Sequence, residues 1–160
     1  MPRESAGLLM YRWRQGELEF LLVHPGGPFW KRKDVGAWTV PKGEIRPGEK
    51  PLTAGLREFE EELGIMPEGP FTPLSPVKQK AGKVVHAWAV EGDFDPAKFN
   101  SNTFEMEWPP RSGRMQQFPE VDQANYFPFM LASQKINPAQ APLLLELQKK
   151  LTSSNFTFGS

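Results

Sequence analysis

Three glutamates, Glu58, Glu61 and Glu62, stand close together near the end of a segment with helical periodicity. Residues three or four positions apart are neighbours on a helix, so these carboxylates repel one another by about 0.2–0.5 kcal/mol per pair. They also fall in the last turns, where the helix dipole disfavours negative charge. The ordinary interpretation is a solvated acidic face. The alternative is a cation site, since Mg²⁺ and Mn²⁺ prefer hard oxygen ligands and would turn the repulsion into binding.

The element that must position these glutamates is a helix, which we expect over residues 50–64. A turn at residues 46–48 precedes it, and Gly64 is a plausible stop with Pro67 beyond it. Its apolar residues recur at spacings of four, three and four: Leu52, Leu56, Phe59 and Leu63. At about 100° per residue the glutamates cluster opposite this stripe. One face should therefore pack on a core while the other presents carboxylates.

The stretch over residues 43–65, GEIRPGEKPLTAGLREFEEELGI, combines glycines, glutamates and an arginine at fixed spacings. These residues are Gly43, Glu49, Arg57, Glu58, Glu61, Glu62 and Gly64, with Phe59 and Ile65 in two apolar positions. The pattern resembles the signature of the Nudix family, G-x5-E-x7-R-E-U-x-E-E-x-G-U with U apolar, at every position. The resemblance implies hydrolysis of a diphosphate linkage with Mg²⁺ or Mn²⁺. It also implies an α+β fold, the Nudix α/β/α sandwich with a mixed β-sheet.

The resemblance further implies roles for individual residues. The implied metal ligands are Gly43, through its backbone carbonyl, Glu58, Glu61 and Glu62. Arg57 would orient the carboxylates and pair with Glu49, although an ordinary helix salt bridge is the alternative. One carboxylate would accept a proton from the attacking water, and both Glu58 and Glu120 are candidates.

The candidate Glu120 lies in a second segment, residues 118–122 (FPEVD), which is similar to one that precedes the last strand in the family. Some members take a further glutamate from this region as a metal ligand or general base. A carboxylate that caps a loop or helix is the alternative interpretation of Glu120. Glu105 and Glu107 are weaker candidates for the same role.

Cations outside the pattern are candidates for holding substrate phosphates. These are Lys42, Lys31, Lys33, Arg111 and Arg114, with Arg32 in the same basic cluster as Lys31 and Lys33. A lysine directly before Gly43 can reach phosphate oxygens beside the metal, but each of these cations could instead be solvated. The aromatic residues that could stack on a base, or pack in the core, are Trp30, Trp108, Phe118 and Tyr126. We expect His24 and His86 to be structural.

Length and composition bound the class of protein. The 160 residues are expected to form one domain over residues 1–152, followed by a loose tail over residues 153–160. Nineteen basic and nineteen acidic residues give no net charge, which argues against general affinity for nucleic acids or anionic membranes. The absence of cysteine excludes disulfides, thiolate zinc sites and a cysteine nucleophile. With no signal-peptide character and no long apolar run, the expected location is cytoplasmic.

The remaining elements are predicted from alternation and turn residues. Strands are expected over residues 6–13, 18–24, 37–40, 71–80, 83–90, 103–108 and 124–127. Helices are expected over residues 129–136 and 139–151, and irregular segments over residues 25–36, 93–102 and 109–120.

The reaction implied by the resemblance is attack of water on a bridged phosphorus of a nucleoside polyphosphate. Dinucleoside polyphosphates such as Ap4A, or (d)NTPs, are the leading substrates, because the Pro-Lys-Gly entry and the FPEVD segment are most similar to hydrolases of these compounds. Removal of an RNA 5′-pyrophosphate is an alternative, and a non-catalytic nucleotide-binding module is another. The expected partner is a small-molecule nucleotide, without a membrane or a general nucleic-acid partner, and a homodimer is an open alternative to a monomer.

Overall fold

Two apolar runs build the centre of the sheet. The computed structural model describes the backbone of residues 3–158 and the side chains of residues 3–152. Here the runs form β1 (Glu4–Arg14) and β2 (Glu17–Pro25), an antiparallel pair. The chain turns between them at Gln15 and Gly16, whose φ angles of 51° and 78° suit a tight hairpin turn.

The main sheet is mixed, with the strand order β4–β6–β1–β2–β9. Among its strand pairs only β1 and β6 (Val84–Glu91) are parallel. The other strands are β3 (Lys42–Glu44), which pairs with β1, β4 (Thr72–Pro73) and β5 (Val77–Lys78), which both pair with β6, and β9 (Val121–Pro128), which pairs with β2. The strand expected over residues 71–80 is therefore two short strands.

The strand expected over residues 37–40 is wrong. These residues form isolated bridges, with Thr39 opposite Val23 and Trp38 opposite Ile136. The backbone hydrogen bonds of the segment are divided between β2 on one side and residues 135–137 on the other. An extended segment with partners on two different elements has the alternation of a strand but not its continuous pairing.

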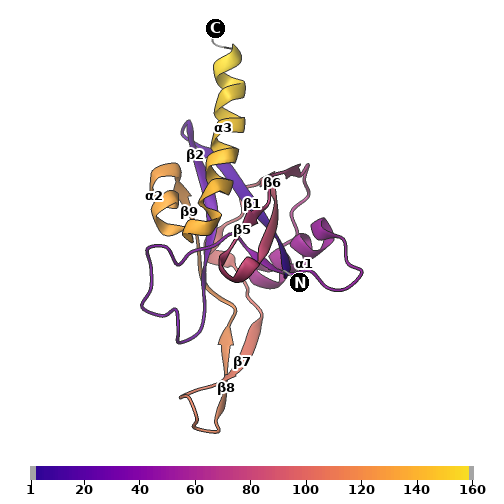
Figure 1. Cartoon of the computed structure of the whole chain (residues 1–160). Coiled ribbons are helices and arrows are strands. Elements are labelled where there is room, and N and C mark those ends of the chain that lie inside the picture. Colours follow the sequence, from indigo (N-terminus) through magenta and orange to yellow (C-terminus); the bar gives the residue numbers. More distant parts are fainter. Residues whose placement is uncertain (1–2, 159–160) are drawn as a thin grey trace.

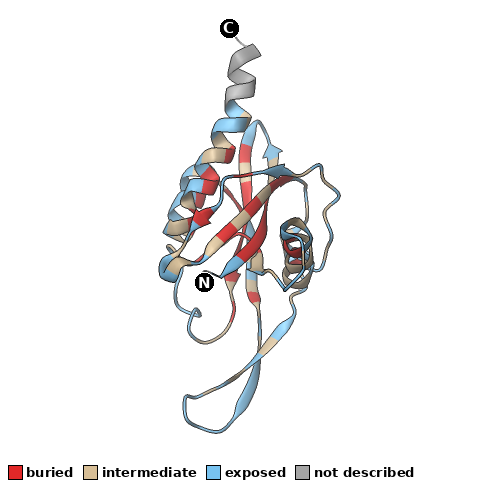
Figure 2. Ribbon diagram, turned by 45° about the vertical axis from the view of Figure 1, so that its right-hand side comes forward, coloured by how far each residue is buried: buried red, intermediate tan, exposed pale blue. Residues whose placement is uncertain are grey.

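Helices cover both faces of the sheet, which makes the chain an α/β/α sandwich (Figure 2). Successive strand residues point to opposite faces. Leu8 of β1 packs in the hydrophobic cluster under α1 (Pro51–Leu63), whereas Leu9 packs in the cluster under α2 (Phe129–Lys135) and α3 (Ala141–Phe158). The expected fold class, an α+β Nudix sandwich with a mixed sheet, is confirmed.

The last helix, α3, is longer than the sequence predicts. It begins at Ala141, after the 3-10 turn η3 (Pro138–Gln140), and its backbone is helical through Phe158. The helical backbone continues through residue 158 into the segment expected to be a loose tail, residues 159–160 lie outside the described residues, and the domain boundary at residue 152 stays a prediction. Two further 3-10 turns, η1 (Lys80–Gly82) and η2 (Pro96–Lys98), lie in connections. No helix in the described part of the chain is long and apolar enough to cross a membrane.

A two-stranded hairpin projects from the body of the molecule (Figure 1). It consists of β7 (Thr103–Glu107) and β8 (Met115–Pro119), which pair with each other in a separate sheet. A strand therefore occupies part of the segment predicted to be irregular. At the tip the Glu107 carboxylate accepts hydrogen bonds from the N–H groups of Arg111 (2.9 Å) and Gly113 (3.1 Å).

Candidate active site

The C-terminal end of α1 is fixed by a close approach at Gly64. This residue has a left-handed conformation (φ 83°), and a side chain there would come within 3.0 Å of Asn100. The absence of a side chain lets residues 100–102 dock on the helix end. The N–H of Asn102 donates to the Glu61 carbonyl at 2.8 Å. The signature glycine therefore ends the helix and admits the neighbouring segment.

Glu120 reaches the same place from the base of the hairpin. Its N–H donates to the Asn102 carbonyl at 2.8 Å, and its carbonyl accepts from the N–H of Gly26 at 3.0 Å. A side chain at residue 26 would overlap the Pro119 carbonyl, so this contact requires glycine. Asn102 thus links the backbone of Glu61 directly to that of Glu120.

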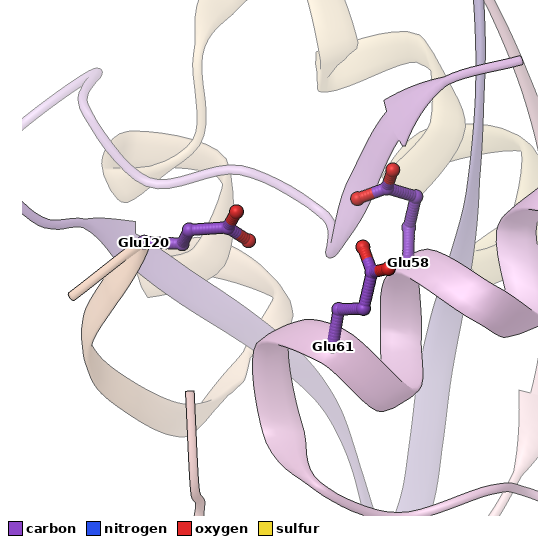
Figure 3. Close-up of side chains that lie close together, drawn as sticks. All are labelled: Glu58, Glu61 and Glu120. Atoms are coloured by element: carbon purple, nitrogen blue, oxygen red, sulfur yellow. The ribbon is translucent and has the colours of Figure 1, made fainter. Parts of the chain in front are cut away.

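Three carboxylates converge at this junction. Glu58, Glu61 and Glu120 each offer an oxygen, and these oxygens lie within 4.8 Å of one another (Figure 3). All three residues are partly exposed, so the group is accessible to solvent. Three accessible hard oxygen donors at this spacing fit a divalent cation such as Mg²⁺ or Mn²⁺. The structure thus joins Glu120, a candidate in the sequence, to two of the three predicted signature ligands.

The third predicted ligand, Glu62, lies beside this group and is not a member of it. Burial raises the pKa of its carboxyl well above the usual range, and the neighbouring Glu58 and Glu120 raise it further. The backbone N–H of Lys42 donates to this carboxyl. Burial lowers the pKa of the Lys42 ammonium, while the charge of Glu62 opposes that effect. Lys42 therefore lies among the carboxylates, where the sequence predicted a contact with phosphate.

Gly43 in β3 lies directly against Glu58. A Cβ atom built at Gly43 would overlap the carboxylate of Glu58. No side chain at residue 43 is therefore compatible with the observed position of that carboxylate. This close approach explains why the signature begins with glycine, and it supports the fit of a metal at the carboxylate group.

Arg57 connects the carboxylates to one another. Its Nε and Nη2 donate to the two oxygens of Glu49 at 2.9 and 3.0 Å, the predicted pairing. Its Nη1 donates to Glu58 at 2.7 Å and to Glu61 at 3.3 Å. Hydrogen bonds from Arg57, and then from the Arg46 N–H, lower the pKa of Glu49 to about 2. One guanidinium thus holds two carboxylates of the cluster in a fixed relation to Glu49.

The basic loop, residues 26–36, is held by the buried side chain of His24. One ring nitrogen lies 2.7 Å from the Asp122 carboxylate, and the other lies 2.6 Å from the Lys33 carbonyl. The ring also packs edge-on against Trp38, with the ring centroids 5.3 Å apart. The sequence predicts a structural His24 but misses Asp122, which only the pairing of β2 with β9 brings to it.

The other predicted residues fall in three places. Lys31 and Lys33 line a cavity between the basic loop and the hairpin. Arg111 and Arg114 are exposed at the hairpin tip, which projects away from the body of the molecule (Figure 1), and a substrate role for them stays a prediction. Tyr126 is buried in the core and therefore is not a surface for stacking.

Comparison with known proteins identifies the family of the chain. The model of the NUDIX domain family matches residues 1–147. The bis(5′-nucleosyl)-tetraphosphatase [asymmetrical] of Caenorhabditis elegans is 40% identical over 68 residues, which are 42% of this chain and 45% of that protein. The protein of the same name from Sus scrofa is 32% identical over 108 residues, which are 59% of this chain and 69% of that protein.

A solved structure, that of a C. elegans Ap4A hydrolase, shares the fold with a TM-score of 0.64 at 23% identity, over 94% of this chain and 99% of that one. The family and these relatives define a class of hydrolases that act on phosphoanhydride bonds. Because the family model covers most of the sequence, the chain belongs to the Nudix family.

Proposed function

We propose that the protein is a metal-dependent pyrophosphohydrolase of nucleoside polyphosphates, with dinucleoside polyphosphates such as Ap4A as the first candidates and (d)NTPs as the second. The observation that carries the proposal is the convergence of Glu58, Glu61 and Glu120 beside Lys42. This arrangement combines ligands for a cation with a cation for phosphate. The two tetraphosphatase relatives support the choice of dinucleoside polyphosphates.

Glu58 and Glu61 would hold Mg²⁺ or Mn²⁺, with Glu62 and the Gly43 carbonyl as further candidate ligands, and an oxygen of Glu120 lies within 4.8 Å of an oxygen of each of these two carboxylates. When bound, such an ion lowers the pKa of bound water and neutralises charge that develops on the phosphates. The chain itself would orient the carboxylates through Arg57 and contact a phosphate oxygen through Lys42.

Glu120 is the residue that we propose as the proton acceptor. Arg57 donates hydrogen bonds to Glu58 and Glu61. In the part of the chain that the structure describes, no hydrogen bond or ion pair holds the Glu120 carboxylate. Burial raises the pKa of Glu120, and the charges of Glu58 and Glu61 raise it further.

The test is a substrate panel with the purified protein and Mg²⁺ or Mn²⁺. Diadenosine polyphosphates, nucleoside triphosphates, nucleotide sugars and 5′-triphosphorylated RNA would be compared by kcat/KM, with products assigned by ³¹P NMR. The highest value is expected for a nucleoside polyphosphate. Preference for the RNA would establish the alternative hydrolase, and no turnover on any compound would favour a nucleotide-binding module.

A matched pair of variants on α1 tests the site. Glu61→Gln should lower kcat by about hundredfold or more, because it removes a charged ligand while it preserves the shape of the side chain. Glu60→Gln changes an exposed neighbour outside the carboxylate group and should leave kcat unchanged. Equal activity of the two variants at saturating Mg²⁺ would contradict the metal site.

A further inference from the structure

A cavity of about 760 Å³ lies between the basic loop and the projecting hairpin. The two walls are joined at both ends. Near the base, Gly27 has a φ of 97° and no room for a Cβ against Phe104, whose ring would lie 2.9 Å away. Near the tip, the rings of Phe29 and Trp108 meet edge to face with their centroids 5.7 Å apart. The space between these contacts has the size that takes small organic ligands.

The aromatic residues of this cavity are not part of the core. Phe29, Trp108 and Phe118 line it, and none of them belongs to either hydrophobic cluster of the sandwich. Phe29 is 61% exposed. Together with Trp108 and Phe118, which are partly exposed, Phe29 forms a group of accessible aromatic rings beside polar residues, and such apolar patches mark ligand-binding grooves. Flat aromatic faces and edges are suited to a planar, π-bonded ring.

The charges around the cavity suit an anionic ligand. Lys31 and Arg32 line it. The acidic residue Asp122 also lines the cavity, but its carboxylate is engaged by His24 at 2.7 Å. The pocket therefore offers cations together with aromatic rings.

The cavity is continuous with the hydrolytic site along the chain. Pro119 lines the cavity, and the next residue, Glu120, contributes to the carboxylate group. Gly27 lines the cavity, and its neighbour Gly26 holds the Glu120 carbonyl. The base of the hairpin and the start of the basic loop are therefore shared by the cavity and the carboxylate group.

We propose that this cavity binds the nucleobase of the substrate, with Phe29, Trp108 and Phe118 around the base and with Lys31 and Arg32 beside the adjoining phosphates. The inference rests on the proposed function, because it assigns the base-binding part of the same site. It makes the hairpin a recognition element for the organic group, whereas α1 supplies the hydrolytic chemistry. Phe29 is the specificity-determining residue that is most open to test.

The experiment measures binding by calorimetry without a divalent metal, so that no turnover is required. AMP and ribose 5-phosphate are the two probes, which differ by the base alone. Wild type should bind AMP at least tenfold more tightly than ribose 5-phosphate. Phe29→Ala should weaken the binding of AMP by about tenfold, because one aromatic partner of the base is lost. The binding of ribose 5-phosphate should stay unchanged, so the difference in affinity between the two probes should disappear. Phe29→Tyr should retain tight binding of AMP.

A matched control separates this effect from general loss of exposed aromatic surface. Trp13→Ala removes a ring that is 40% exposed near the end of β1, outside the cavity, and should leave both affinities unchanged. Equal affinity of wild type for the two probes, or equal weakening of both probes in Phe29→Ala, would overturn the base pocket. AMP binding with the expected pattern but no hydrolysis of any phosphoanhydride would instead refute the proposed function and leave the pocket standing.

Discussion

Replacement of Gly43 by alanine should disable the site while the protein still folds. The new methyl group would overlap the Glu58 carboxylate, which must then leave its position. Moving that carboxylate breaks its 2.7 Å hydrogen bond with Arg57. A hydrogen bond to a charged group is worth about 1.5–3 kcal/mol. At tenfold per 1.4 kcal/mol, kcat/KM should fall by about tenfold to hundredfold.

The loss of stability should be smaller than this hydrogen bond alone would suggest. Gly43 has no left-handed backbone conformation, and alanine at a compatible position stabilises a protein by about 0.4–1 kcal/mol through the unfolded state. The strain at Glu58 is relieved when its flexible side chain rotates away. Steady-state kinetics on the best substrate, Mg²⁺ titration and urea unfolding of the same preparation would separate the two effects.

Gly55→Ala is the matched control. A Cβ atom at Gly55 would meet its nearest neighbours at 3.5 Å, an ordinary contact. In a helix interior this change should stabilise the protein by about 1 kcal/mol, while kcat/KM stays at the wild-type value. If Gly43→Ala kept full activity with normal Mg²⁺ dependence, the reasoning from the close contact between Gly43 and the Glu58 carboxylate would be refuted.

Three further results are expected from the same network and the core. The lysine of Arg57→Lys cannot bind both oxygens of Glu49 and also reach Glu58. Metal affinity or kcat/KM should therefore fall about 10–100-fold, and Mg²⁺-dependent kinetics would measure the loss. The pKa of Glu49 is lowered from 4.5 to about 2 by Arg57 and by the Arg46 N–H. Between these pH values the unfolded state binds more protons, so the stabilisation from Glu49 is complete above about pH 4.5 and is lost as pH falls toward about 2. Urea unfolding across this window should show a smaller decrease in Glu49→Gln than in wild type. Phe59→Ala should lower the free energy of unfolding, measured in urea, by about 3–5 kcal/mol, because this ring of α1 is fully buried. Phe29→Ala should lower it little, because Phe29 is exposed.

The features that the sequence predicts well are those with local causes. The α1 stripe and its stop at Gly64 depend on spacing within one helix, and both are found. Gly43, Glu49 and Arg57 belong to one contiguous pattern, and the structure brings them together. The helix α1 and most strands are predicted for the same reason, because the periodicity of apolar side chains can be read from neighbouring residues.

The features that the sequence misses depend on residues far apart in the chain. Val40 N–H donates to the buried Gln140 side chain, 100 residues away, and nothing local marks that glutamine. Asp122 finds His24 across 98 residues. The sequence offers Glu120 as a candidate, but its place beside Glu61 depends on Asn102, which docks between their backbones. Such contacts depend on how whole helices and strands pack together, and no short sequence pattern indicates that packing.

The hydrogen bond between Glu120 N–H and the Asn102 carbonyl closes the hairpin at its base. Everything between these two residues leaves the body of the molecule and returns to the same point (Figure 1). The hairpin could therefore be lengthened, shortened or replaced without moving Glu120 from its position beside α1. Changes within the hairpin would therefore alter the cavity that it lines and leave the carboxylate group in place.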